Sequence, residues 1–121
     1  MIDNVVTMNR DSLYLLKPNF HDAGRVYFCP GCAEMLGLLE FYPALKSRLS
    51  VQYLNFARPR QELVALLGEE HQSCPVLVLA EPSPKLPPHL KVHQAKGRAF
   101  VEGAREIAEY LAHVHGTGLP H

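Results

Sequence analysis

The chain has 121 residues, of which 47% are apolar and 20% are charged, which is typical of one soluble globular domain with a single core. Twelve basic and twelve acidic residues balance each other, which argues against nucleic acid or an anionic membrane as a partner bound through net charge. The same balance gives little repulsion between copies, so we expect a monomer or a weak dimer.

The start of the chain contains no basic segment followed by an apolar one, so the sequence predicts no signal peptide. The longest apolar runs are about as long as a strand and too short to cross a membrane. An odd count of three cysteines argues against the disulfide framework of a secreted protein. We therefore expect a cytoplasmic protein.

The apolar pattern predicts alternating strands and helices along the chain. Residues 32, 35, 36 and 39 follow the helical spacing i, i+3, i+4, i+7, whereas residues 76–80 form a continuous apolar run typical of a strand covered on both faces. Residues 19–28 and the proline-rich segment 82–98 are expected to be loops. The expected strands are residues 13–16, 51–56, 76–80 and 99–102, and the expected helices are residues 29–42, 61–67 and 103–114.

Cys29, Pro30, Gly31 and Cys32 form a C-x-x-C pair at the start of the first expected helix. Pro30 suits the first turn of a helix, where a missing N–H costs nothing. The unpaired N–H groups and the positive end of the helix dipole favour a thiolate at this place and lower a cysteine pKa. The pair is therefore a candidate redox dithiol. It is also compatible with half of a zinc site, or with two cysteines that pack as small hydrophobic residues.

The order strand, C-x-x-C helix, strand, helix, X-Pro, strand, strand, helix resembles the thioredoxin fold from about residue 13 to residue 115. The resemblance implies a single α/β domain over residues 1–121, with a central mixed four-stranded sheet flanked by three helices. Its second diagnostic point is Cys74-Pro75, because the matching proline of thioredoxin-like proteins is cis and packs against the dithiol. The whole arrangement is similar to a small bacterial thioredoxin-like family of unknown function.

The Cys-Pro-x-Cys form resembles glutaredoxins more than thioredoxins. A weaker likeness, from Pro75 and again from Glu102 to Leu111, is to the N-terminal domain of glutathione transferases. In that family an acid followed by a serine holds the γ-glutamyl end of glutathione. Here the acid is Glu102 and the serine is replaced by Gly103. The resemblance makes glutathione a candidate ligand of poor affinity.

The resemblance implies a thiol–disulfide oxidoreductase that acts on protein or small-molecule thiols and disulfides. Cys29, as the first and more exposed cysteine, is expected to attack a disulfide, and Cys32 is expected to resolve the mixed disulfide. The dithiol is its own redox centre, so no cofactor is required. The same resemblance places substrate contacts at Pro30, Gly31, Cys74, Pro75 and Glu102.

Cys74 leads to an alternative hypothesis. The resemblance places it beside Cys29, close enough for disulfide exchange, at a position where relatives carry threonine, valine or isoleucine. Thiolates of Cys29, Cys32 and Cys74 would together suit Cu(I), zinc or an iron–sulfur unit. The alternative is therefore a non-enzymatic thioredoxin-fold binding module or a soft-metal carrier. Cys74 is equally explained as a small apolar residue at the mouth of a buried strand.

Overall fold

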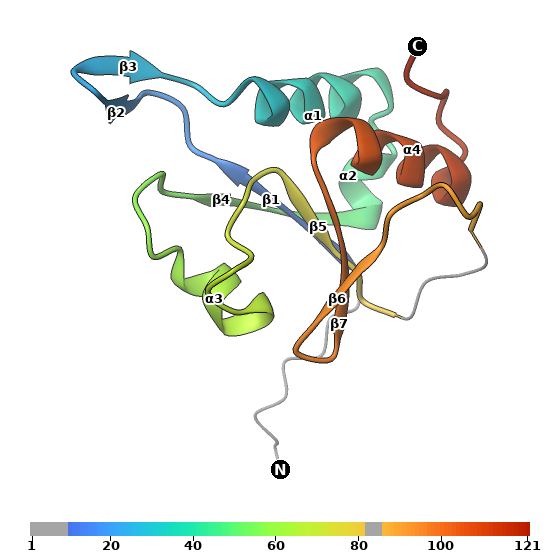
Figure 1. Cartoon of the computed structure of the whole chain (residues 1–121). Coiled ribbons are helices and arrows are strands. Elements are labelled where there is room, and N and C mark those ends of the chain that lie inside the picture. Colours follow the sequence, from blue (N-terminus) through green and yellow to red (C-terminus); the bar gives the residue numbers. More distant parts are fainter. Residues whose placement is uncertain (1–9, 82–85) are drawn as a thin grey trace.

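A computed structural model describes residues 10–81 and 86–121 of the chain. Its centre is a five-stranded mixed sheet with the strand order β4-β1-β5-β7-β6 (Figure 1). β1 is parallel to β4 and antiparallel to β5, and the remaining pairs are antiparallel. The strands of this sheet are β1 (Asp11–Leu16), β4 (Leu49–Leu54), β5 (Val76–Val78), β6 (His93–Ala95) and β7 (Arg98–Glu102).

Helices cover both faces of this sheet. Figure 1 shows α1 (Pro30–Phe41) and α4 (Ala104–His115) together on one face, and α3 (Gln61–Leu67) on the other. A short helix, α2 (Leu45–Arg48), connects α1 to β4. α1 ends just before Pro43 because the residue that precedes a proline disfavours the helical conformation.

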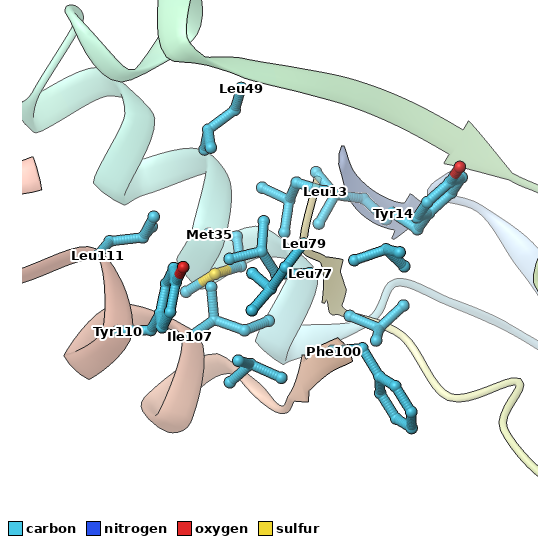
Figure 2. Close-up of a cluster of buried hydrophobic side chains, with 14 of the residues drawn as sticks. Leu13, Tyr14, Met35, Leu49, Leu77, Leu79, Phe100, Ile107, Tyr110 and Leu111 are labelled. Carbon is cyan, nitrogen blue, oxygen red and sulfur yellow. The ribbon is translucent and has the colours of Figure 1, made fainter. Parts of the chain in front are cut away.

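The hydrophobic core lies mainly between the sheet and the α1–α4 pair. Leu13, Leu77 and Val101 are cross-strand neighbours that contribute from the sheet, and each is at most 1% exposed. Figure 2 shows Met35 of α1 and Ile107 of α4 directed towards Leu77 at the centre of the cluster. This packing fixes the position of α1, and with it the C-x-x-C pair, relative to β1 and β5.

The structure contains the four expected strands and the three expected helices, with element ends that differ by two residues at most. The expected count of four strands in the sheet is wrong, because β6 adds a fifth strand at the edge beside β7. Residues 93–95 lie within the segment 82–98 that was expected to be a loop, and residues 82–85 lie outside the described part. The short helix α2 lies between the expected helix 29–42 and the expected strand 51–56.

The expected loop over residues 19–28 is instead a hairpin of β2 (Phe20–Asp22) and β3 (Arg25–Tyr27). Both this hairpin and the β6–β7 hairpin are closed by two residues with positive φ, Ala23-Gly24 and Lys96-Gly97. Such turns match the right-handed twist of the flanking strands. In Figure 1 the β2–β3 hairpin projects beyond the N-terminal end of α1, away from the main sheet.

None of the helices within residues 10–81 and 86–121 has the length and apolar character that crossing a membrane requires.

Candidate functional site

Cys29 is the N-cap residue of α1, with an extended backbone conformation at φ −83° and ψ 114°. Pro30 occupies the first helical turn, as expected, and is exposed. The Cys29 sulfur accepts a hydrogen bond from the backbone N–H of Cys32 at 3.2 Å. A helix N-terminus leaves such N–H groups without intrahelical partners, and an acceptor that carries negative charge suits them best. The Cys29 sulfur thus takes the place that a side-chain oxygen occupies in an ordinary N-cap.

Cys32 is one helical turn further on and is only 3% exposed. Its sulfur accepts a hydrogen bond from the backbone N–H of Leu16, at the end of β1, at 3.3 Å. Burial, and to a smaller extent the adjacent Cys29 thiol, raise the pKa of the Cys32 thiol to about 12. The expectation that the helix start lowers a cysteine pKa is therefore wrong for Cys32, because loss of solvation outweighs the N–H groups.

Gly31 and Pro75 bring the C-x-x-C turn into contact with the segment before β5. The Cys74–Pro75 peptide bond is cis, as predicted, and Pro75 is buried. A Cβ atom built on Gly31 would lie 3.1 Å from the Pro75 Cδ atom and 3.6 Å from the Ala104 Cβ atom. Only glycine leaves room for this close approach. The carbonyl of Pro75 also accepts a hydrogen bond from the N–H of Gly103 at 3.1 Å, so α4 is tied to the same place.

Cys74 is a neighbour of Cys29, as predicted. The Cys29 thiol donates to the backbone carbonyl of Cys74 over 3.8 Å, and both residues are partly exposed. Burial raises the pKa of the Cys74 thiol to about 11. All three cysteines are free thiols, and the Cys29 sulfur contacts the backbone of each of the other two. Even so, the described residues include no group of three His, Cys, Asp or Glu side chains arranged to hold a metal ion, so the soft-metal alternative gains no support.

Glu102 ends β7 next to Pro75, since it pairs with Val76 in the sheet. Its carboxylate lies 3.7 Å from the His93 Nε2 atom, so the expected glutathione contact already faces a neighbour in β6. Gly103, which follows it, has φ +89° and ψ 147°, a conformation in which a serine would be strained. The backbone here thus accounts for the absence of the hydroxyl group that the glutathione transferase pattern carries.

Arg60 is a residue of this site that the sequence did not indicate. It is 6% exposed, and its guanidinium donates to the carbonyls of Phe56 and Gln72 at 2.6–3.0 Å. Its charge acts on the cysteines, most strongly on Cys74. No local pattern signals this burial, because one of the two carbonyls comes from a loop twelve residues further along the chain.

Exposed apolar residues directly precede Cys29 in the chain. Val26, Tyr27 and Phe28 precede it in the chain and are 57%, 41% and 59% exposed. They belong to, or directly follow, β3 of the projecting hairpin. Phe20 of β2 stacks on Phe56 with ring centroids 4.2 Å apart, and this contact attaches the hairpin to the segment after β4. Phe28, which directly precedes the thiol in the chain, is the most exposed of the three.

Comparison of the chain with curated proteins and with solved structures finds no match. A family model, however, covers the residues from just before β1 to the segment after α4, and thus every element of the site described above. The chain belongs to the family described as "Protein of unknown function (DUF3088)", whose model matches residues 10–119.

Proposed function

We propose that the protein is a thiol–disulfide oxidoreductase of thioredoxin-like type, in which Cys29 attacks and Cys32 resolves. The observation that carries this proposal is the hydrogen bond of 3.2 Å from the Cys32 N–H to the sulfur of the N-cap residue Cys29. It brings a partly exposed sulfur and a buried one together at the N-terminus of α1. That arrangement suits a nucleophile at the surface and a protected thiol behind it.

The reaction transfers two electrons from the dithiol to the substrate. The Cys29 thiolate attacks one sulfur of a substrate disulfide, which forms a mixed disulfide and releases the other sulfur as a thiolate. Cys32 loses its proton and attacks the Cys29 sulfur, which forms the Cys29–Cys32 disulfide and releases the second substrate thiolate. The substrate is then a dithiol, and an external thiol returns the protein to its reduced state. This cycle needs a reducing compartment, and the cytoplasm provides one.

The thioredoxin-like assignment is supported by topology. A parallel β1–α1–β4 unit is followed by antiparallel β5 and β7 and by α4. A cis proline at position 75 lies against the C-x-x-C turn, which is the relation that the resemblance requires. The extra edge strand β6 and the β2–β3 hairpin are additions to that plan.

A test of the reaction measures reduction of a small disulfide by the purified protein in the presence of dithiothreitol. Cys29→Ser should abolish the activity, since serine cannot form the mixed disulfide. The parent protein, after mild oxidation, should lose two hydrogens in a mass spectrum that maps to the C-x-x-C pair. Activity of Cys29→Ser equal to that of the parent would reject the proposal.

The substrate class follows from the exposed apolar residues that directly precede Cys29 in the chain. We propose that disulfide-bonded polypeptides react faster than small polar disulfides, because an apolar segment next to the disulfide would cover Val26, Tyr27 and Phe28. Phe28→Ser should slow reduction of a polypeptide disulfide several-fold and leave reduction of a small polar disulfide unchanged. Phe41→Ser is the matched control, because this residue is 82% exposed at the other end of α1. Equal effects of the two variants on the polypeptide would refute this choice of surface.

A further inference from the structure

We propose that Cys74 is a second resolving thiol, so that a mixed disulfide on Cys29 is resolved by Cys32 or by Cys74. This inference rests on the proposed function, because both routes begin with the mixed disulfide on Cys29. It concerns which sulfur completes the reaction and adds a third member to the redox centre.

The first argument is the position of the Cys29 sulfur. It lies 3.2 Å from the backbone nitrogen of Cys32 and 3.8 Å from the carbonyl oxygen of Cys74. The two contacts come from different elements, the first turn of α1 and the segment that leads into β5. Because the Cys29 sulfur contacts the backbone of both residues, we infer that a side-chain rotation brings either thiol to it.

The second argument is accessibility. Cys32 is 3% exposed, and its sulfur is engaged by the N–H of Leu16 at 3.3 Å. Cys74 is partly exposed, and no hydrogen bond to its sulfur is found in the described part of the chain. A thiolate forms more readily on a sulfur that solvent reaches, because water then stabilises its charge. The exposure of the residue therefore favours Cys74 over Cys32, although burial still raises the pKa of the Cys74 thiol.

The third argument is the charge around Cys74. The Arg60 guanidinium is buried and held by two carbonyls, and none of the ion pairs among the described residues includes it. Arg60 and the exposed Arg58 both lower the pKa of Cys74, opposing burial and the charge of Cys29. The resulting pKa is about 11, compared with about 12 for Cys32. The two arginines therefore act in the direction that makes the Cys74 thiol easier to ionise.

The proposed step balances in the same way as the Cys32 route. The Cys74 thiol gives its proton to solvent, and its sulfur attacks the Cys29 sulfur of the mixed disulfide. A Cys29–Cys74 disulfide forms, the bond to the substrate sulfur breaks, and the substrate leaves as a thiolate that takes up a proton. The oxidant is the substrate disulfide, and Cys32 remains a free thiol.

The experiment treats the reduced protein with 2-hydroxyethyl disulfide and follows the intact mass after alkylation of free thiols. Cys32→Ser should lose two hydrogens, and peptide mapping should find the Cys29–Cys74 disulfide. The double variant Cys32→Ser/Cys74→Ser should keep the mercaptoethanol adduct on Cys29. Cys32→Ala repeats the measurement with an apolar side chain at the buried position, so that a folding defect of the serine variant does not decide the result.

Stable mercaptoethanol adducts in Cys32→Ser and in Cys32→Ala, with Cys74 still open to alkylation, would overturn the proposal. That outcome leaves the proposed function intact, because Cys29 has then reacted as a nucleophile. Absence of any adduct or disulfide in the parent and in every variant would instead reject the proposed function itself, and the role of Cys74 with it.

Discussion

The buried thiol of Cys32 predicts that the protein loses stability at alkaline pH. Cys32 is 3% exposed, and burial raises its pKa from 9.0 to about 12. Above pH 9 the unfolded chain ionises this thiol, whereas the folded protein keeps the proton. Because the folded pKa is the higher one, the stabilisation is fully present below pH 9 and is lost as the pH rises towards 12.

The expected loss of stability follows from the difference between the pH and the pKa that Cys32 has in the unfolded chain. Each pH unit above 9 costs about 1.4 kcal/mol while the folded state stays protonated. At pH 10.5 the free energy of unfolding should therefore be lower by about 2 kcal/mol than at pH 8 on account of Cys32 alone. Cys74, with a pKa of about 11, and Tyr110, with a pKa of about 12, add to the total.

A matched variant separates the contribution of Cys32 to this loss of stability from the contributions of the other groups. Urea unfolding of the parent and of Cys32→Ala would be measured at both pH values under reducing conditions. The variant loses packing at each pH. Between pH 8 and pH 10.5, however, its free energy of unfolding should fall by about 2 kcal/mol less than that of the parent protein. An equal fall in the two proteins would mean that Cys32 ionises as easily in the fold as in the unfolded chain. Our explanation of its protected thiol would then be wrong.

Three further predictions concern the surroundings of the dithiol. Gly31→Ala should lower both the stability of the protein and its rate of disulfide reduction, since the new Cβ atom would lie 3.1 Å from Pro75. Gly37→Ala in the same helix is the control: its Cβ atom meets nothing within 4 Å, and the substitution should stabilise the protein by about 0.5–1 kcal/mol. Glutathione should bind weakly by calorimetry, and Glu102→Ala should remove that binding; tight binding unaffected by the substitution would show that the ligand lies elsewhere. Ala23→Gly should stabilise the protein by about 1 kcal/mol, because a non-glycine residue at φ 50° is strained, and an unchanged or lower thermal midpoint would contradict this reading of the turn.

The helix that carries the dithiol was predictable because its signals are local. Pro30 stands in the first turn, apolar residues follow at helical spacing, and Pro43 closes the segment. The segment Gln61–Leu67 was predicted to the residue for similar reasons, with its apolar face buried and Gly68 as its C-cap. Such patterns depend only on neighbours a few positions away, and a sequence displays them directly.

The two hairpins escaped prediction for one shared reason. A two-residue turn with positive φ at both positions is normally recognised by Asn-Gly or Asp-Gly. Here the turns are Ala23-Gly24 and Lys96-Gly97, with φ of 50° at both non-glycine residues. Alanine and lysine are uncommon in that conformation. Three of the four strands that they join, β2, β3 and β6, are also only three residues long, too short to show an alternating pattern.

The ease with which each thiol of the site ionises could not be obtained from the sequence either, because it depends on how deeply the residue is buried. Position at a helix start predicts an easily ionised thiol, and the same rule applies to Cys29 and Cys32 alike. Packing separates the two, since Cys32 faces β1 and is 3% exposed while Cys29 stays at the surface. The cation that acts on Cys74 is held in place by backbone carbonyls and not by a carboxylate. No carboxylate of the described residues pairs with it, so its positive charge acts on Cys74, which is partly exposed as Cys29 is.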